Sequence, residues 1–207
     1  MALLRIGVLG AGHIGGTAAK LFARAGHQVA VANSRGPASL ASFVSSAGPS
    51  VRATSPADAV AFGEVILLAI PWRNKDQLPP GKLFAEKIAI DAMNPYSAVG
   101  HVIDLGERTS SEEVAKQLPG ARLVKAFNTM GWKTLETGGG AVDQDRLTIF
   151  LAGDDVAAKT TVATLIEGIG FAPLDTGSLR DGGRRQQPGS PLYGRPLTLR
   201  EAKRILG

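Results

Sequence analysis

The residues with the clearest chemical potential lie near the start of the chain, in a turn of the pattern Gly-x-Gly-x-x-Gly formed by Gly10, Gly12 and Gly15. Such a turn binds the pyrophosphate of a dinucleotide at the first free backbone N–H groups of a helix. Gly10 permits the tight turn, Gly12 leaves room for the pyrophosphate, and Gly15 lets the helix pack closely on the strand. His13 and Ile14 complete the turn, and we expect them to bind the cofactor with it.

A second group of polar residues, Asn33, Ser34 and Arg35, lies about 20 residues beyond the turn. At this distance an NAD-dependent protein carries an Asp or Glu that accepts hydrogen bonds from the ribose 2′-hydroxyl, and here there is no acidic residue. Ser34 can donate to a phosphate oxygen, and Arg35 can form a charge-assisted pair with one. The loop is therefore expected to select the 2′-phosphate of NADP(H), the alternative for Arg35 being a solvated loop charge.

These residues need a strand, a turn and a helix to position them, and the surrounding sequence predicts all three. An apolar run precedes the turn, and apolar residues at helical spacing follow it. Strands are expected at 4–9, 28–32, 51–53, 64–70, 87–91, 121–126, 147–152 and 171–174, and helices at 13–26, 37–47, 55–62, 109–118, 154–169 and 198–206. This alternation predicts an α/β fold with a Rossmann-type, doubly wound parallel sheet.

The segments that follow the predicted strands are further candidates for cofactor contact. In an open parallel sheet, ligands bind beyond the carboxyl ends of the strands. The cofactor-binding candidates in these segments are Ala69, Ile70, Pro71, Trp72, Asn94, Pro95, Ala126 and Asn128. For Trp72, an aromatic side chain that packs on the surface is the alternative.

The chain divides into an NADP-binding Rossmann domain at 1–126, a small C-terminal α/β extension at 127–175 that acts as a cap, and a basic tail at 176–207. The tail holds seven of the 23 Lys and Arg residues but two of the 18 Asp and Glu residues, so the whole net charge of +5 lies there. Its Gly- and Pro-rich part up to 196 predicts a mobile loop. We expect Arg184 and Arg185 in this loop to attract an anionic coenzyme, with a solvated or dimer-forming arm as the alternative.

The composition excludes several kinds of site. The chain has no cysteine, which excludes disulfides, thiolate nucleophiles and Cys-ligated metals and fits a cytoplasmic location. Its three histidines lack metal-ligand spacing, so no metal site is expected. The longest apolar run, at 65–70, is too short for a membrane span, and no nucleic-acid motif accompanies the tail. We therefore expect neither a membrane nor a nucleic acid as partner.

Taken together, these motifs resemble the coenzyme F-420-dependent NADP oxidoreductase family. The resemblance rests on the glycine turn, the loop 33–35, the Pro-Trp pair at 71–72, the stretch 125–129, the turn 152–155 and the segment 191–198. The stretch 126–129 is also similar to the reductase domain of the STEAP metalloreductases. The resemblance implies NADPH bound across the strand ends and a planar deazaflavin or flavin stacked on its nicotinamide, with a homodimer expected.

Hydride transfer between two stacked rings needs no acid, base or nucleophile from the protein, so no catalytic residue is expected. Lys125 and Asn128 are similar to the Lys and Asn of 3-hydroxyacid dehydrogenases, but there those residues lie on a helix of a large all-helical domain that we do not expect here. The expected substrate is a small redox molecule, and the expected activity is hydride exchange between NADPH and coenzyme F-420. A flavin or ferric reductase that uses FMN or FAD, and a non-enzymatic NADPH-binding regulator, are the alternatives.

Overall fold

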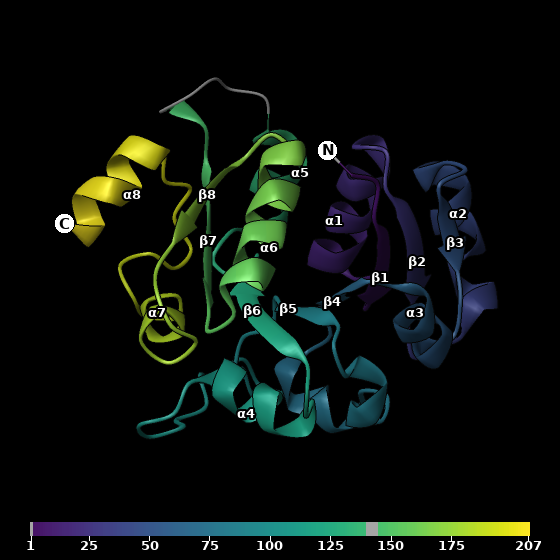
Figure 1. Cartoon of the computed structure of the whole chain (residues 1–207), viewed down its shortest axis with the longest axis horizontal. Helices are drawn as coiled ribbons and strands as arrows, with labels where there is room; N and C mark the ends of the chain where they lie inside the picture. Colours follow the sequence, from purple (N-terminus) through teal and green to yellow (C-terminus); the bar gives the residue numbers. More distant parts are fainter. Residues whose placement is uncertain (1, 140–144) are drawn as a thin grey trace.

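The computed structural model describes residues 2–139 and 145–207, which form a sheet of eight strands in the order β3-β2-β1-β4-β5-β6-β7-β8 (Figure 1). The strands are β1 Arg5–Leu9, β2 Gln28–Ala32, β3 Val51–Ala53, β4 Val65–Leu68, β5 Ile88–Asp91, β6 Arg122–Ala126, β7 Thr148–Gly153 and β8 Ala172–Asp175. The first six strands have the 3-2-1-4-5-6 order of a Rossmann sheet. The prediction of a doubly wound α/β fold is confirmed.

Two strands depart from the predicted parallel sheet, because β7 is antiparallel to β6 and β8 is parallel to β7, so that both run opposite to the first six strands. A parallel crossover must carry the chain from the end of one strand back to the level of its start. The helix after β6, α5 (Trp132–Thr137), has six residues and spans about 9 Å. Since β6 is about 16 Å long, α5 cannot make that return by itself.

Helices cover both faces of the sheet. One face carries α1 (His13–Arg24), α2 (Ala41–Ala47), α5 and α6 (Val156–Gly168), and the other carries α3 (Pro56–Phe62) and α4 (Ser110–Gln117) (Figure 1). The central strands are therefore buried on both sides, which explains the uninterrupted apolar sequence of β4. Within residues 2–139 and 145–207, no helix is both long and apolar enough to span a membrane.

Several predicted helix boundaries change for local reasons. The helix predicted at 37–47 begins as a 3₁₀ turn, Pro37–Leu40, before α2. The start of α6 falls later than predicted, because the Asp155 carboxylate caps the helix by accepting a 2.7 Å hydrogen bond from the Ala158 N–H. Two further 3₁₀ helices, Trp72–Gln77 and Gly81–Phe84, connect β4 to β5.

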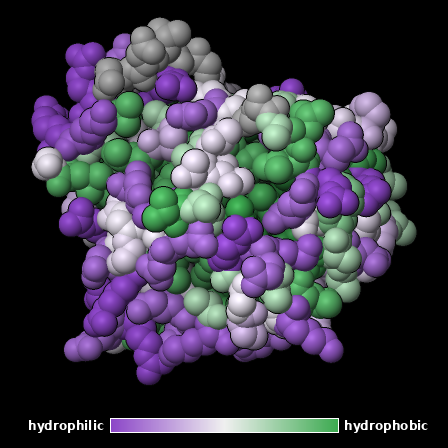
Figure 2. Space-filling model, viewed as in Figure 1, coloured by the Kyte–Doolittle hydropathy of each residue, from purple (hydrophilic) through white to green (hydrophobic). Residues whose placement is uncertain are grey.

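The C-terminal segment packs on the sheet, and the predicted loop up to residue 196 contains a short helix that the sequence did not predict. Residues Asp181–Arg185 form the short helix α7, and Leu199–Leu206 form α8. Leu197 and Ala202 are buried against Phe150 of β7, which anchors α8 to this edge of the molecule. Hydrophilic and hydrophobic residues lie side by side at the edge of the molecule near α8 (Figure 2), and the basic side chains Arg200, Lys203 and Arg204 are exposed to solvent. The division of the chain at residues 126 and 175 remains a proposal, and the sheet itself continues through β7 and β8.

Candidate cofactor site

The three glycines of the turn have different structural requirements. Gly10 has a φ of +108°, and a Cβ there would collide with the carbonyl of Ala69 at the end of β4. A Cβ at Gly15 would collide with the carbonyl oxygen of Gly10, so α1 could not approach the strand. A Cβ at Gly12 would meet nothing within 4 Å. The fold thus requires Gly10 and Gly15, whereas Gly12 keeps space open in front of the first N–H groups of α1, as a pyrophosphate needs.

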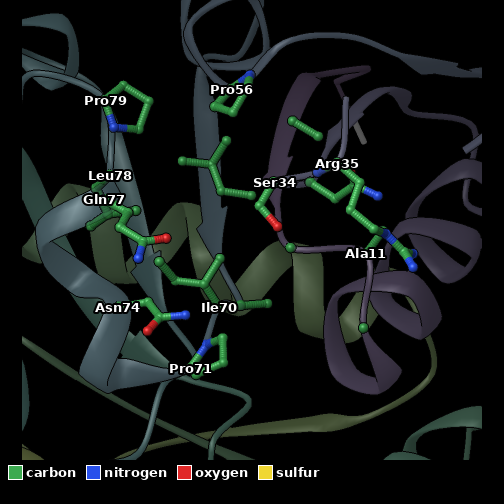
Figure 3. A pocket seen from close by; sticks show the side chains of 16 residues that line it. Ala11, Ser34, Arg35, Pro56, Ile70, Pro71, Asn74, Gln77, Leu78 and Pro79 are labelled. Carbon is green, nitrogen blue, oxygen red and sulfur yellow. Dashed lines mark hydrogen bonds between the residues drawn. The ribbon is translucent and has the colours of Figure 1, made fainter. Parts of the chain in front are cut away.

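The loop after β2 is organised by the side chain of Asn33. Its Oδ1 accepts a hydrogen bond of 3.0 Å from the backbone N–H of Arg35, and its Nδ2 donates one of 2.9 Å to Ser39 Oγ. The side chains of Ser34 and Arg35 are left exposed at the edge of a cavity (Figure 3). The loop therefore presents a hydroxyl and a guanidinium without using either to hold itself together.

A cavity of about 350 Å³ lies between the glycine turn, this loop and the segment after β4. Ser34 and Arg35 stand on one side of it, and Asn74 and Gln77 of the 3₁₀ helix after β4 stand across from them (Figure 3). Eight predicted site residues line this cavity: Gly10, Gly12, Asn33, Ser34, Arg35, Ala69, Ile70 and Pro71.

A second cavity of about 380 Å³ adjoins the first and shares Gly12, Ala69, Ile70 and Pro71 with it. Its other lining residues are His13, Ile14, Trp72, Arg73, Ala92, Met93, Asn94 and Tyr96. The two cavities together follow the carboxyl ends of β1, β4 and β5, which is where a dinucleotide lies on a Rossmann sheet.

Aromatic rings border the second cavity. Trp72 is only 7% exposed, and its Nε1 donates a 3.1 Å hydrogen bond to the carbonyl of Ser110 in α4. The ring of His13 lies 4.6 Å from that of Trp132, measured between centroids. Trp72 thus lines the predicted cleft, and its burial contradicts the alternative of a side chain that packs on the surface.

The remaining predicted residues lie behind these walls. Gly15, Pro95, Ala126 and Asn128 line neither cavity, so contact of these four residues with a cofactor stays a prediction. Asn128 supports the wall indirectly, because its Nδ2 donates to Asn94 Oδ1 at 3.0 Å and to the Gln186 carbonyl at 2.8 Å. Just before it, Phe127 has a φ of +66°, a left-handed conformation that costs energy in a residue other than glycine.

Lys125 is fully buried and lines neither cavity. Its ammonium nitrogen lies 3.6 Å from Asp91 Oδ2, and burial lowers the pKa of Lys125 although Asp91 opposes that change. A side chain in this position cannot touch a substrate in either cavity. The similarity of Lys125 to a catalytic lysine is therefore one of sequence alone.

Some lining residues were missed in the sequence. Ala92, Met93 and Tyr96 follow the predicted strand 87–91, so the same strand-end rule that selected Asn94 would have found them. The other missed residues are Leu9, Ala11, Ala32, Pro56, Arg73, Asn74, Gln77, Leu78 and Pro79. The 73–79 group lies in the 3₁₀ helix Trp72–Gln77 and the two residues after it, for which the sequence carries no recognisable signal.

Comparisons with known proteins agree with this geometry. Residues 5–95 match the family model described as NADP oxidoreductase, coenzyme F-420-dependent. The metalloreductase STEAP3 of Rattus norvegicus is 30% identical over 178 residues, which are 84% of this chain and 34% of STEAP3. The chain therefore spans about a third of that relative.

Two solved structures match over nearly the whole chain. A hypothetical protein from Sinorhizobium meliloti is 35% identical with a TM-score of 0.83, covering 95% of this chain and 96% of its own. A protein from Arthrobacter sp. FB24, whose description proposes an F-420-dependent NADP reductase, is 26% identical with a TM-score of 0.78 and covers 94% and 99%.

The fold, the glycine turn and the loop at Ser34 and Arg35 define an NADP-dependent oxidoreductase of the Rossmann class. Within that class, the chain is similar to the coenzyme F-420-dependent NADP oxidoreductase family, whose model matches residues 5–95.

Proposed function

We propose that this protein transfers a hydride between NADPH and a deazaflavin, coenzyme F-420, stacked on the nicotinamide. The observation that carries the proposal is the pair of adjoining cavities that meet at Gly12 and at the segment from Ala69 to Pro71. One cavity presents groups suited to a phosphate, and the other has aromatic and apolar walls suited to flat rings. Such an arrangement can hold a dinucleotide and place a second planar molecule beside its reactive end.

In this proposal the first cavity provides NADP selectivity. Ser34 and Arg35 bind the 2′-phosphate, and the open space at Gly12 admits the pyrophosphate to the start of α1. Ile70, Leu78 and Pro79 provide apolar surface for an adenine ring. These side chains support the proposal that the phosphate-bearing half of the cofactor binds in this cavity.

The second cavity is suited to a reaction that needs orientation more than acid–base catalysis. The residues that line it include no carboxylate and no lysine. When bound, the two coenzymes supply the hydride donor and acceptor, and the protein contributes proximity and exclusion of water. The exposed guanidinium of Arg73 lies at this cavity and offers a positive charge to an anionic acceptor.

Turnover with defined acceptors tests the proposal. The purified protein is mixed with NADPH and, in separate reactions, oxidised F-420, FMN, FAD or a ferric chelate, and loss of the nicotinamide absorbance is followed. Turnover with F-420 well above that with the others supports the proposal. Turnover with a flavin or ferric chelate but not with F-420 supports the flavin or ferric reductase. NADPH binding without turnover of any acceptor supports the regulator.

Two further expectations also remain proposals. A homodimer is expected from the family resemblance, and sedimentation of the purified chain would distinguish it from a monomer. A cytoplasmic location is expected from the absence of cysteine, and fractionation of the source cells would test it.

A further inference from the structure

The backbone of Met93, in the wall of the second cavity, is held at both of its polar groups by one buried ion pair. Asp91 Oδ1 accepts a 3.0 Å hydrogen bond from the Met93 N–H, and Lys125 Nζ donates a 3.2 Å bond to the Met93 carbonyl. Asp91 and Lys125 face each other at the ends of β5 and β6. The pair therefore clamps the first turn of the segment that forms the wall.

Two serines at the start of α4 complete this network. Ser111 Oγ donates a 2.5 Å hydrogen bond to Asp91 Oδ2 and accepts one of 3.1 Å from Lys125 Nζ. Lys125 Nζ also lies 3.4 Å from Ser110 Oγ, and the carbonyl of Ser110 accepts the hydrogen bond from the Trp72 indole. The network thus joins two walls of the cavity, the Met93 segment and Trp72.

The C-terminal segment seals the network from solvent. Gly183 of α7 lies over the aliphatic part of Lys125, where a Cβ would stand 3.8 Å from Lys125 Cδ. Asp91, Lys125, Ser110 and Ser111 are all 0% exposed. Burying two charges so completely is costly, and hydrophobic residues of similar size often replace such a pair without loss of stability. Stability alone therefore gives no reason for an ion pair at this place.

We propose that Lys125 and Asp91 are positioning residues that fix Met93 and Trp72 so that the nicotinamide is held in one orientation for hydride transfer. They act through the wall of the cavity and touch neither the cofactor nor the acceptor. The hydride transfer in this inference rests on the proposed function. The orientation of bound NADPH, in contrast, does not depend on which acceptor is used.

The test compares single and double substitutions. Lys125→Met removes the charge and the donors while keeping the length of the side chain, and Asp91→Asn keeps the shape. The double variant D91N/K125M removes both charges and avoids leaving either one unpaired. Ser111→Ala is a milder change in the same network. Lys159→Met, which removes the ion pair of 2.7 Å with Asp175 outside both cavities, is the matched control.

Five quantities are measured for each variant: urea stability, the affinities for 2′,5′-ADP and for NADPH, the emission of bound NADPH, and kcat with the acceptor found active. The fragment 2′,5′-ADP carries the phosphates of the first cavity and lacks the nicotinamide. In the double variant we expect its affinity to stay within about twofold, and kcat to fall about 10- to 100-fold, the loss typical of a misplaced reactant. The emission of bound NADPH is expected to shift toward that of the free cofactor.

The outcomes separate positioning from a purely structural role. If the double variant unfolds at a lower urea concentration but keeps the emission of bound NADPH and kcat, the network is only structural and the proposal is overturned. Equal weakening of NADPH and 2′,5′-ADP would also overturn it. If no acceptor is turned over by the unmodified protein, the proposed function fails, while the emission and the fragment affinity still decide the role of the pair. If the double variant does not fold, Ser111→Ala is judged by the same two binding measurements.

Discussion

Replacing Arg35 by Ala should weaken the binding of NADPH and leave that of NADH almost unchanged. Hydrogen bonds to charged groups are worth about 1.5–3 kcal/mol, which corresponds to about a 10- to 150-fold change in affinity. The Arg35 side chain is exposed at the edge of its cavity, so water and salt screen its charge, and we expect a loss near the lower end of that range. The loop should keep its shape, because the hydrogen bond that organises it uses the backbone N–H of Arg35 and the Asn33 carboxamide.

Titration of protein fluorescence with each dinucleotide measures both affinities. Arg24→Ala removes an equally exposed arginine from the end of α1, away from both cavities, and controls for the change in net charge. Arg35→Lys should recover part of the affinity, since a lysine keeps the charge but not the paired donors. Equal losses of NADPH and NADH affinity in Arg35→Ala would refute the assignment of this residue to the 2′-phosphate.

Three other predictions concern the turn, the interior and the C-terminal segment. Gly12→Val should abolish binding of either dinucleotide, because the side chain would fill the space that the pyrophosphate needs. The circular dichroism spectrum should stay the same, because a Cβ there meets no other atom of the protein within 4 Å. Retained binding would show that the turn is not the phosphate site. Burial lowers the pKa of His27 below its usual 6.5. As the pH falls, the unfolded chain therefore takes up a proton at this residue before the folded chain does. The free energy of unfolding that depends on neutral His27 is complete above pH 6.5 and declines as the pH falls toward the pKa in the folded state. Urea unfolding at several pH values should show a smaller decline in stability for His27→Gln, whereas the control His101→Gln, in an exposed loop, should leave the decline unchanged. If the decline persists in His27→Gln, other titratable groups cause it. Replacing Arg184 and Arg185 together by Ala should raise KM for intact F-420 and reduce its salt dependence, with little effect on a deazaflavin that lacks the anionic chain; the same effect on both acceptors would indicate a packing role.

The sequence alone was sufficient to predict the features that depend on residues close to one another along the chain. The glycine turn predicted the Rossmann unit because the strand before it and the helix after it are consecutive in the sequence. The polar loop at Ser34 and Arg35 could be placed because its distance from the turn is set by one helix and one strand. The rule that ligands lie at the carboxyl ends of parallel strands then selected Ala69 to Trp72 and Asn94, all of which line the two cavities.

The tertiary structure decided what depends on distant parts of the chain. The sequence placed Lys125 at the end of a strand, but its burial required Asp91 beside it, α4 in front of it and α7 over it. The packing of the tail likewise depends on Phe150, which lies more than 40 residues before Leu197 and becomes its neighbour only when β7 forms. Local propensity and spacing act over a few residues and determine turns, helices and strands. Burial and charge pairing depend on which surfaces meet in the folded chain, and these decide whether a charged side chain serves the site directly or supports it from behind.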